Sequence, residues 1–561
     1  MTSREAAGSF VLLLHSHLPY ARLAGRWPHG EEWLHEALAE TYLPLLLALR
    51  RLQRDGIRAP VTVGVTPVLA EQLADPTILD HFAEFLAERL ERARADVRRL
   101  ERAGDNARAG IARWYATHLG TLKREFHEVL GGDIIRTLRE LQGSDSVEIA
   151  GSAATHGYLP LFRRSSSIRG QVRTGIRTHV RHFGRAPSAF WLPECAYRPA
   201  HIDGDGAYQP GLESYLAEEG VRCFFAETHA VEGGRPVGKA AGDAIGPYEM
   251  VPRRLLVLAE RYQEPTLRTT YLPYQVGGSP VSAFARNNRT GLQVWSGTHG
   301  YPGDYRYREF HKRDDTSGLH YWKITGRDVD LGAKELWDPE AAFTLVREHA
   351  RHFADLVRDL LADFRAKHGR HGVVMSAYDT ELFGHWWFEG IAWLEESLRL
   401  LAGEPSVELA GASGFLEAHP PEEALQLPES SWGTGGNHST WWNPDTEWMW
   451  PHLYAIEARL EELAASTSGG RVVQPTLQQA TRQAVREALL AQSSDWPFLV
   501  TTGQAAEYAS MRFLTHVRRF HELADAIEAG HIDQARLAEL EHADNPFPDL
   551  QPEDWQARTE R

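Results

Sequence analysis

Short apolar runs rich in β-branched residues alternate along the chain with longer stretches of helical periodicity. Strands that alternate with helices imply βα units and parallel pairing. The pattern therefore predicts an α/β fold with a closed or nearly closed β/α barrel, and an open doubly wound sheet is the alternative. The predicted strands lie near Phe10–His17, Val61–Thr66, Val147–Ser152, Ala189–Pro193, Val221–Ala226, Val281–Ala285, Gly372–Ala377 and Val407–Ala410.

Two segments interrupt the regular spacing inside the barrel, which we place at residues 1–420. Residues 79–141 are highly charged and helical in period, with apolar residues such as Phe82 and Phe85 on one face. This pattern indicates a small inserted helical subdomain. Residues 231–268 are rich in Gly and Pro and lack a clean period, which favours an active-site loop.

Strand signals stop after about Pro451. The amphipathic stretches Leu477–Leu490 and Tyr508–Ala526 indicate helices instead. We therefore expect a C-terminal helical domain at residues 421–545, followed by a tail at residues 546–561.

Composition and charge narrow the possible partners. A chain of 561 residues with a net charge of −16 is an ordinary globular protein of several packed units. The acidic balance argues against nucleic acid and anionic membranes, because both need a basic surface. No apolar run suits a signal peptide or a membrane span, so we expect a cytoplasmic protein. Two cysteines cannot build a disulfide framework, and 17 Trp suit stacking on sugar rings.

Polar residues follow several of the predicted strands, where a β/α barrel carries its chemistry. His15 and His17 end the first strand, His156 follows the third, Glu194 the fourth and Asp379 the seventh. Two carboxylates on different strand ends fit glycosidic bond cleavage, in which one attacks the anomeric carbon and the other protonates the leaving oxygen. Spacing alone does not choose Asp379 over Glu381, which shares its strand face.

The pair His15-x-His17 has a second interpretation. Two histidines at this spacing and an Asp could hold a divalent metal, as in a polysaccharide deacetylase. No further His/Asp cluster with ligand spacing completes such a site in the sequence. We therefore favour contacts to sugar hydroxyls, and we expect neither a metal nor a cofactor.

Five short segments together resemble the signatures of glycoside hydrolase family 57. They occur in the family's order, at His15–Pro19, Gly151–His156, Trp191–Tyr197, Tyr378–Trp387 and Ser431–His438. Within that family the chain is most similar to the α-1,4-glucan branching enzymes, through Val294–Asp304, Arg308–His311 and Gln492–Phe498. The resemblance covers nearly the whole chain.

The resemblance implies a fold, an activity and residue roles. The fold is an incomplete (β/α)7 barrel with an inserted helical subdomain and a C-terminal helical domain. The activity is a retaining 1,4-α-glucan branching reaction on amylose or glycogen-like substrates, with Glu194 as nucleophile and Asp379 as general acid/base. Hydrolysis by an α-amylase and transfer by a 4-α-glucanotransferase are the nearer alternatives, and the metal-dependent deacetylase is a distant one. The matching substrate positions are His15, His17, His156, Trp295, Trp432, Trp441 and Asp495, with Trp442 as the alternative to Trp441.

Branching enzymes of this family also carry a tyrosine on a loop over the site. The chain departs from the family there, because the excursion at residues 231–268 is longer than expected. The counterpart is one of Tyr248, Tyr262, Tyr271 and Tyr274.

Overall fold

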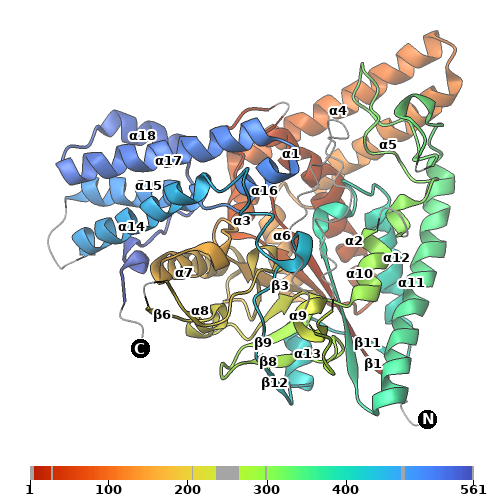
Figure 1. Ribbon diagram of the computed structural model, residues 1–561. Coiled ribbons are helices and arrows are strands. Elements are labelled where there is room, and N and C mark those ends of the chain that lie inside the picture. Colours follow the sequence, from red (N-terminus) through yellow and green to blue (C-terminus); the bar gives the residue numbers. More distant parts are fainter. Residues whose placement is uncertain are drawn as a thin grey trace.

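The computed structural model of the protein describes residues 6–26, 29–204, 206–234, 264–296, 300–326, 328–468 and 474–558. Its centre is a curled sheet of parallel strands enclosed by helices (Figure 1). The parallel strands, in spatial order, are β10 (Gly372–Asp379), β1 (Gly8–Ser16), β2 (Val61–Val65), β3 (Val147–Ser152), β4 (Ala189–Trp191), β7 (Cys223–Ala226) and β9 (Ser282–Ala285).

The barrel is left open between β9 and β10, the two strands at the ends of the spatial order. Within the described residues no ladder joins β9 to β10. Isolated backbone bonds span the gap instead, from the Asn287 N–H to the Met375 carbonyl, 2.7 Å, and from the Val373 N–H to the Tyr271 carbonyl, 2.9 Å. β8 (Tyr274–Val276) runs antiparallel beside β9 and pairs with β12 (Ala424–Leu425), while β11 (Val407–Leu409) pairs with the start of β1. The predicted seven-stranded, incomplete barrel is confirmed.

The strands are mostly apolar because helices cover their outer face. Every residue of β1 and β2 is buried, as expected for a parallel sheet packed on both sides. The chain also forms a small hairpin of β5 (His201–Ile202) and β6 (Tyr208–Gln209). The helices around the barrel are α1 (Glu31–Ala37), α2 (Leu43–Arg54), α3 (Pro67–Ala74), α6 (Ile134–Gly143), α7 (Ser165–Phe183), α8 (Leu212–Glu218), α9 (Thr228–Glu232), α10 (Asn288–Trp295), α11 (Pro339–His368), α12 (Gly390–Ala402) and α13 (Ala412–Ala418).

Two long helices form the inserted helical subdomain. α4 (Pro76–Arg102) and α5 (Asn106–Glu128) pack side by side and project from the barrel (Figure 1). The side chains of Asp75 and Asp105 cap their N-termini by accepting backbone N–H bonds, which stabilises helix starts. The predicted apolar face, including Phe82 and Phe85, is the buried one.

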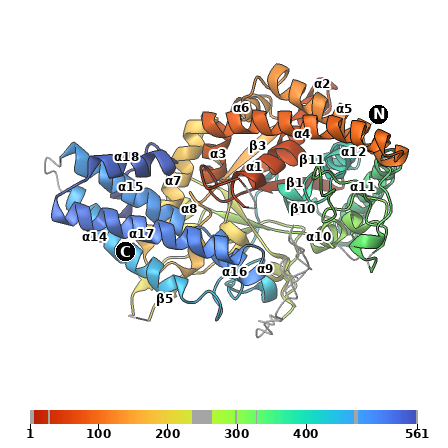
Figure 2. The ribbon, with the colours of Figure 1, turned by 90° about the horizontal axis from the view of Figure 1, so that it is seen from above.

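The C-terminal helical unit lies at the opposite side of the barrel, beside α7 (Figures 1 and 2). It consists of α14 (Met449–Ser468), α15 (Pro475–Ala491), α16 (Asp495–Thr502), α17 (Ala506–Ala529) and α18 (Gln534–Ala543). The helices predicted at Leu477–Leu490 and Tyr508–Ala526 lie within α15 and α17. One cluster of buried apolar side chains runs from Phe190 of the barrel to Phe513 of α17, so the two units share a core.

Residues 546–558, predicted to be a tail, are packed against the rest of the molecule. The short helix at Pro552–Trp555 lies against α7 and α14. The Trp555 side chain is fully buried and sits over Gly170 of α7, where an added Cβ would collide with the indole. A side chain of any size at position 170 would displace this tryptophan.

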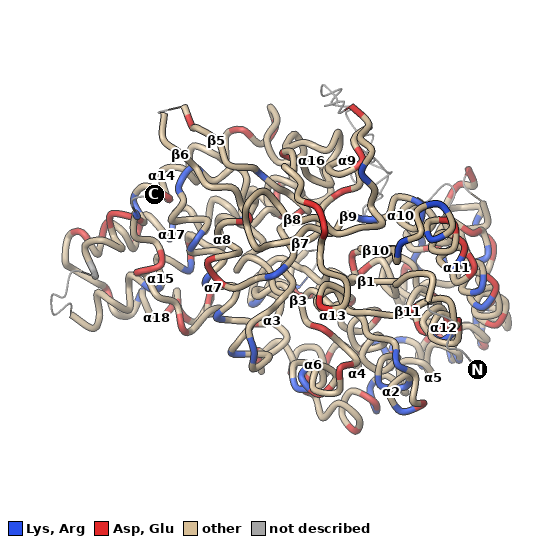
Figure 3. The backbone as a smooth tube through the Cα atoms, turned by 90° about the horizontal axis from the view of Figure 1, so that it is seen from below, with Lys and Arg blue, Asp and Glu red and all other residues tan. Residues whose placement is uncertain are grey.

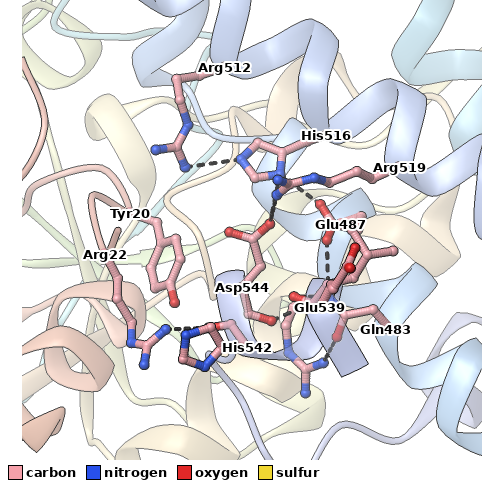
Figure 4. A network of polar contacts seen from close by, with 12 residues as sticks. Tyr20, Arg22, Gln483, Glu487, Arg512, His516, Arg519, Glu539, His542 and Asp544 are labelled. Atoms are coloured by element: carbon pink, nitrogen blue, oxygen red, sulfur yellow. Dashed lines mark hydrogen bonds and ion pairs between the residues drawn. The ribbon is translucent and has the colours of Figure 1, made fainter. Parts of the chain in front are cut away.

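A polar network joins the C-terminal unit to the loop that follows β1 (Figure 4). The Tyr20 hydroxyl donates to the Asn545 side chain, 2.8 Å, and Arg22 donates to the His542 carbonyl. Behind them the buried His516 contacts Glu487, with Nδ1 to Oε2 at 2.7 Å. Burial lowers the pKa of His516 to about 3, so this histidine is neutral and the contact is a hydrogen bond.

Charged residues lie mainly along the outer helices, such as α2, α6 and α11, where both signs are interspersed (Figure 3). Among the described residues no helix is long and apolar enough to cross a bilayer. Most of the excursion predicted at residues 231–268, including Tyr248 and Tyr262, lies outside the described residues.

Candidate active site

The predicted site residues meet at the carboxyl edge of the barrel. The parallel register pairs His15 of β1 with Asp379 of β10, and Ser152 of β3 with Trp191 of β4. Because the strands end at one edge, the residues that follow them converge there.

Glu194 stands on a tight turn directly after β4. Its backbone is left-handed, with φ 62°, and so are those of Cys195, φ 48°, and of His156 on the neighbouring strand end, φ 55°. Non-glycine residues in this region are strained and concentrate at functional sites. The strain turns the Glu194 side chain into the opening of the barrel, where it is 13% exposed.

Both oxygens of the Glu194 carboxylate accept hydrogen bonds. The Trp432 indole Nε1–H donates to Oε2 at 2.6 Å, and the Ser494 hydroxyl donates to Oε1 at 3.1 Å. The Trp432 backbone N–H also donates to the Glu194 carbonyl at 3.1 Å. Donors on both oxygens fix the carboxylate in one orientation and favour its ionised form.

Asp379 and Glu381 occupy different environments, although they share a strand face. Glu381 is buried, and its Oε1 accepts bonds from the Tyr42 hydroxyl and from the His17 backbone N–H. Burial, and secondarily the negative charge of Asp379, raises the pKa of Glu381. Asp379 ends β10 and is only half-buried. The geometry therefore favours Asp379 as the carboxyl group open to a ligand.

Four aromatic rings form a stack beside Glu194. His15 lies 4.5 Å from Trp191 and 5.0 Å from His156 between ring centroids, and His156 lies 4.0 Å from His17. His15 and His17 point to the same side, as their spacing predicts, with near-parallel rings 6.1 Å apart. The stack presents imidazole edges, which can donate to or accept from hydroxyl groups.

His17 is tied to the C-terminal unit by an ion pair. Its Nε2 lies 2.9 Å from Oδ2 of Asp495, and its Nδ1 lies 3.0 Å from the Thr66 hydroxyl. Burial acts to lower the pKa of His17, but the Asp495 carboxylate outweighs it and the net shift is upward. The same pairing lowers the pKa of Asp495 against the effect of its own burial. With both ring nitrogens of His17 engaged, the geometry favours hydrogen bonding over metal ligation.

The tryptophans near the candidate site differ in exposure. Trp441 is 1% exposed and stacks on Tyr158 with centroids 4.2 Å apart. Trp432 is 4% exposed, so both rings are buried. Trp442, the alternative to Trp441, is 40% exposed. Trp432 contacts Glu194, and Trp295 lies half-buried at the end of α10.

Two of the four candidate loop tyrosines have fixed positions. The Tyr271 ring stacks on Phe364 of α11 with centroids 4.9 Å apart. Tyr274 lies in β8, and its hydroxyl bonds to the backbone of Thr269. Both are parts of the packed scaffold, and the other two lie outside the described residues.

The structure adds residues for which the sequence analysis predicted no role. Ser494 contacts Glu194 and His156, and the buried pair of Arg286 and Glu227, 2.8 Å apart, lies at the strand ends with the guanidinium over the Trp432 ring. Glu227 and Arg286 directly follow β7 and β9, so the strand-end rule could have found them. Ser494 lies in the segment Gln492–Phe498 that carries part of the family resemblance, and the packing of the C-terminal unit places it beside Glu194.

Side chains close enough to share one cation occur elsewhere. Among the described residues these groups are His371 with Glu408 and His419, and Glu487 with His516 and Asp544. Neither group includes a residue of the candidate site.

Comparison with known proteins agrees with this arrangement. Residues 11–428 match the model of glycosyl hydrolase family 57, and residues 452–555 match a model described as 1,4-alpha-glucan branching enzyme, C-terminal. The chain belongs to glycosyl hydrolase family 57. Its match to the family covers the barrel and the strand ends that carry Glu194 and Asp379.

Similar proteins within family 57 match over nearly the full chain. A 1,4-alpha-glucan branching enzyme of Thermococcus kodakarensis is 43% identical over 96% of this chain and 77% of its own length. The crystal structure of a family 57 branching enzyme from that organism, in complex with glucose, superposes with a TM-score of 0.89 at 41% identity, covering 99% of this chain and 97% of the other. An alpha-amylase of Thermotoga maritima superposes with a TM-score of 0.81 at 28% identity, covering 98% and 99%.

Proposed function

We propose that this chain is a retaining 1,4-α-glucan branching enzyme, with Glu194 as nucleophile and Asp379 as general acid/base. The observation that carries the assignment is the Glu194 carboxylate, held by donors on both oxygens at the barrel edge where Asp379 also ends its strand. The similarity of residues 452–555 to the C-terminal model of branching enzymes supports the choice of branching.

In the first step Glu194 attacks the anomeric carbon of an α-1,4-linked glucose. The bond from that carbon to the glycosidic oxygen breaks, and Asp379 transfers its proton to the departing chain. A β-linked glucosyl ester on Glu194 remains, and Asp379 is left ionised. Two carboxyl groups in these roles are what retaining glycosidases require.

In the second step the ester is transferred to another glucan chain. Asp379 removes the proton of a glucose 6-hydroxyl, and that oxygen attacks the anomeric carbon. The bond to Glu194 breaks, its electron pair returns to the carboxylate, and an α-1,6 branch forms. Asp379 has regained its proton, so the enzyme is restored.

The substrate is an α-1,4-glucan such as amylose or glycogen. His15, His17 and His156 offer ring edges to sugar hydroxyls, and the open face of Trp442 offers a platform for a glucose ring. Trp295 and Trp432 complete the aromatic lining, and Asp495 acts through His17. Glycogen synthesis in the cytoplasm is the proposed setting, and no cofactor enters the proposed reaction.

The linkage of the products tests this function. Amylose incubated with the enzyme should lose iodine staining with little rise in reducing ends, because each cleaved bond is replaced by a new one. A debranching enzyme specific for α-1,6 bonds should then release short linear chains. Reducing ends that rise in step with the loss of staining, with nothing released on debranching, would identify an α-amylase.

Three rival functions have different signatures. Hydrolysis deserves the direct test above, because the similar alpha-amylase of Thermotoga maritima spans the whole chain. A 4-α-glucanotransferase would instead change chain lengths without making α-1,6 bonds. Prolonged chelator treatment should leave activity unchanged, whereas loss that zinc restores would indicate the metal-dependent deacetylase.

A further inference from the structure

Ser494 belongs to the C-terminal helical unit, yet it reaches the proposed nucleophile. Its hydroxyl oxygen lies 3.1 Å from Oε1 of Glu194 and 2.9 Å from Nδ1 of His156. The residue is 1% exposed, and its backbone N–H donates to the His156 carbonyl at 3.1 Å. The buried Ser494 hydroxyl therefore bridges the His156 imidazole and the Glu194 carboxylate.

The position of Ser494 next to α16 makes this contact informative. Ser494 directly precedes α16, and its own backbone is helical, with φ −65° and ψ −18°. Its side chain makes no capping bond to that helix. The hydroxyl is directed at Glu194 and His156 instead.

The direction of the bonds follows from the donors available. An ionised carboxylate only accepts, so the single hydroxyl proton of Ser494 goes to Glu194. The serine oxygen then accepts from Nδ1–H of His156. This order sets the tautomer of the imidazole and aligns the three groups.

We propose that Ser494 is a positioning residue that holds the Glu194 carboxylate in its attacking orientation and keeps it ionised. The inference rests on the proposed nucleophilic role of Glu194. Trp432 fixes Oε2 from the other side, so losing Ser494 removes a donor from Oε1 and weakens the hold on the orientation of the carboxylate. The same hydroxyl stabilises the carboxylate that leaves in the second step.

Other contacts hold the chain around Ser494 against the barrel. Variants at these contacts distinguish loss of this packing from loss of the bond to Glu194. The Gln171 side chain donates to Gln492 at 3.0 Å, and the Thr155 hydroxyl donates to the Leu489 carbonyl. The Gln492 side chain bonds to Gln171 rather than to Glu194 and thus offers a matched control for loosened docking. Thr502 of the same helix, whose hydroxyl bonds only to backbone carbonyls of α16, offers a control for loss of a hydroxyl.

The test measures release of the aryl group from an aryl α-maltooligoside across pH, using the full-length enzyme. Ser494→Ala should slow glycosylation roughly 10- to 100-fold with little change in KM, as expected for one bond to a charged group. The acidic limb of kcat/KM should move up by roughly one pH unit, because the ionised carboxylate loses a donor. Ser494→Thr should restore both to within a few-fold of the parent.

The controls give the opposite pattern. Gln492→Ala should lower the unfolding temperature without moving the acidic limb, and Thr502→Ala should leave rate and pH profile unchanged. If Ser494→Ala does not fold, Ser494→Cys carries the same test, because a thiol fills a similar volume as a weaker donor.

An unshifted acidic limb in Ser494→Ala with near-parental glycosylation would overturn the inference. So would a Ser494→Thr variant as impaired as Ser494→Ala while Gln492→Ala shows the same loss, since that pattern indicates docking alone. Failure of the proposed function looks different, because the parent enzyme itself would then release no aryl group from the donor.

Discussion

Glu194 is held by groups from three distant parts of the chain before any substrate is bound. Its own turn supplies a left-handed backbone, Trp432 comes from the segment after the barrel, and Ser494 from the C-terminal unit. A strained backbone at a residue whose carboxylate accepts hydrogen bonds on both oxygens costs folding free energy, and such strain is concentrated at functional sites. Asp379 ends β10 and is only half-buried, which suits a group that must give and take a proton.

Removal of either carboxylate should abolish turnover. Glu194→Ala and Asp379→Ala should each lower kcat on amylose by roughly 10⁴-fold or more, because each removes a group that bonds to a reacting atom. With an activated α-glucosyl donor and azide, Glu194→Ala should yield a β-glycosyl azide and Asp379→Ala an α-glycosyl azide. Product analysis by NMR distinguishes the two anomers.

Glu381→Gln is the matched control for these variants. The amide oxygen can still accept from the Tyr42 hydroxyl and the His17 backbone N–H, so turnover should fall by less than about 10-fold. If Glu381→Gln lost activity as completely as Asp379→Ala, the choice of Asp379 over Glu381 would be contradicted. The same azide anomer from Glu194→Ala and Asp379→Ala would contradict the roles of nucleophile and general acid/base.

The pairing of His17 with Asp495 predicts a pH-dependent stability. The folded pKa of His17 lies above its ordinary 6.5, so its contribution is present below that value and is lost as pH rises through the folded pKa. Asp495→Asn should therefore destabilise the protein by about 2 kcal/mol near pH 6 and by less near pH 9. Urea unfolding at both pH values measures the difference. In a His17→Gln background, the loss of unfolding free energy caused by Asp495→Asn should no longer depend on pH. If it still does, the pH dependence belongs to a group other than His17.

The candidate site was predictable from the sequence wherever its residues stand at strand ends. His15, His17, His156, Glu194 and Asp379 follow that rule, and the family resemblance selected Asp379 over Glu381. The exposure of Trp441 and the reach of Ser494 were not predictable, because both depend on how the C-terminal unit packs on the barrel. Spacing along the chain carries no information about such a contact.

At the scale of elements, strand positions follow from apolar runs, while short segments depend on their neighbours. All eight predicted strands occur. The structure adds β8 and β12, which were not predicted and have only three and two residues. β8 forms by pairing with β9, and β12 forms by pairing with β8. The segment at Pro552–Trp555 is similar. Pro546 and Pro548 before it are typical of a tail. The Trp555 ring over Gly170 of α7 and the bond from Arg177 to Asp554, 2.7 Å, make the segment a packed element.

Trp555 should therefore contribute strongly to stability. Trp555→Ala removes a fully buried indole from between α7 and α14 and should cost about 3–5 kcal/mol of unfolding free energy. Gly170→Ala should destabilise as well, because its methyl group would displace the same indole. Leu514→Ala on α17, at a side chain 45% exposed, should change stability by less than about 0.5 kcal/mol. Equal denaturation midpoints for Trp555→Ala and Leu514→Ala would show that the segment is a loose tail.

At the scale of the whole molecule, the C-terminal unit is structurally inseparable from the barrel. The shared apolar cluster joins Phe190 to Phe513, the network of Figure 4 joins Tyr20 to Asn545, and the site itself joins His17 to Asp495. Three independent kinds of contact thus cross one boundary. A barrel without this unit would expose its share of the apolar cluster and lose two of the groups around Glu194.

This coupling predicts that the barrel and the C-terminal unit unfold together. Calorimetry should give one transition, because neither unit keeps a complete core alone. The ratio of calorimetric to van't Hoff enthalpy should be about 1. Asp544→Asn, which weakens the ion pair with Arg519 inside the network, should lower the temperature of that single transition. Activity on amylose should disappear at the same temperature as the near-UV circular dichroism. Two separate transitions, with the barrel signal surviving loss of the C-terminal helices, would contradict a shared core; activity that also survived would contradict the roles given to Ser494 and Asp495.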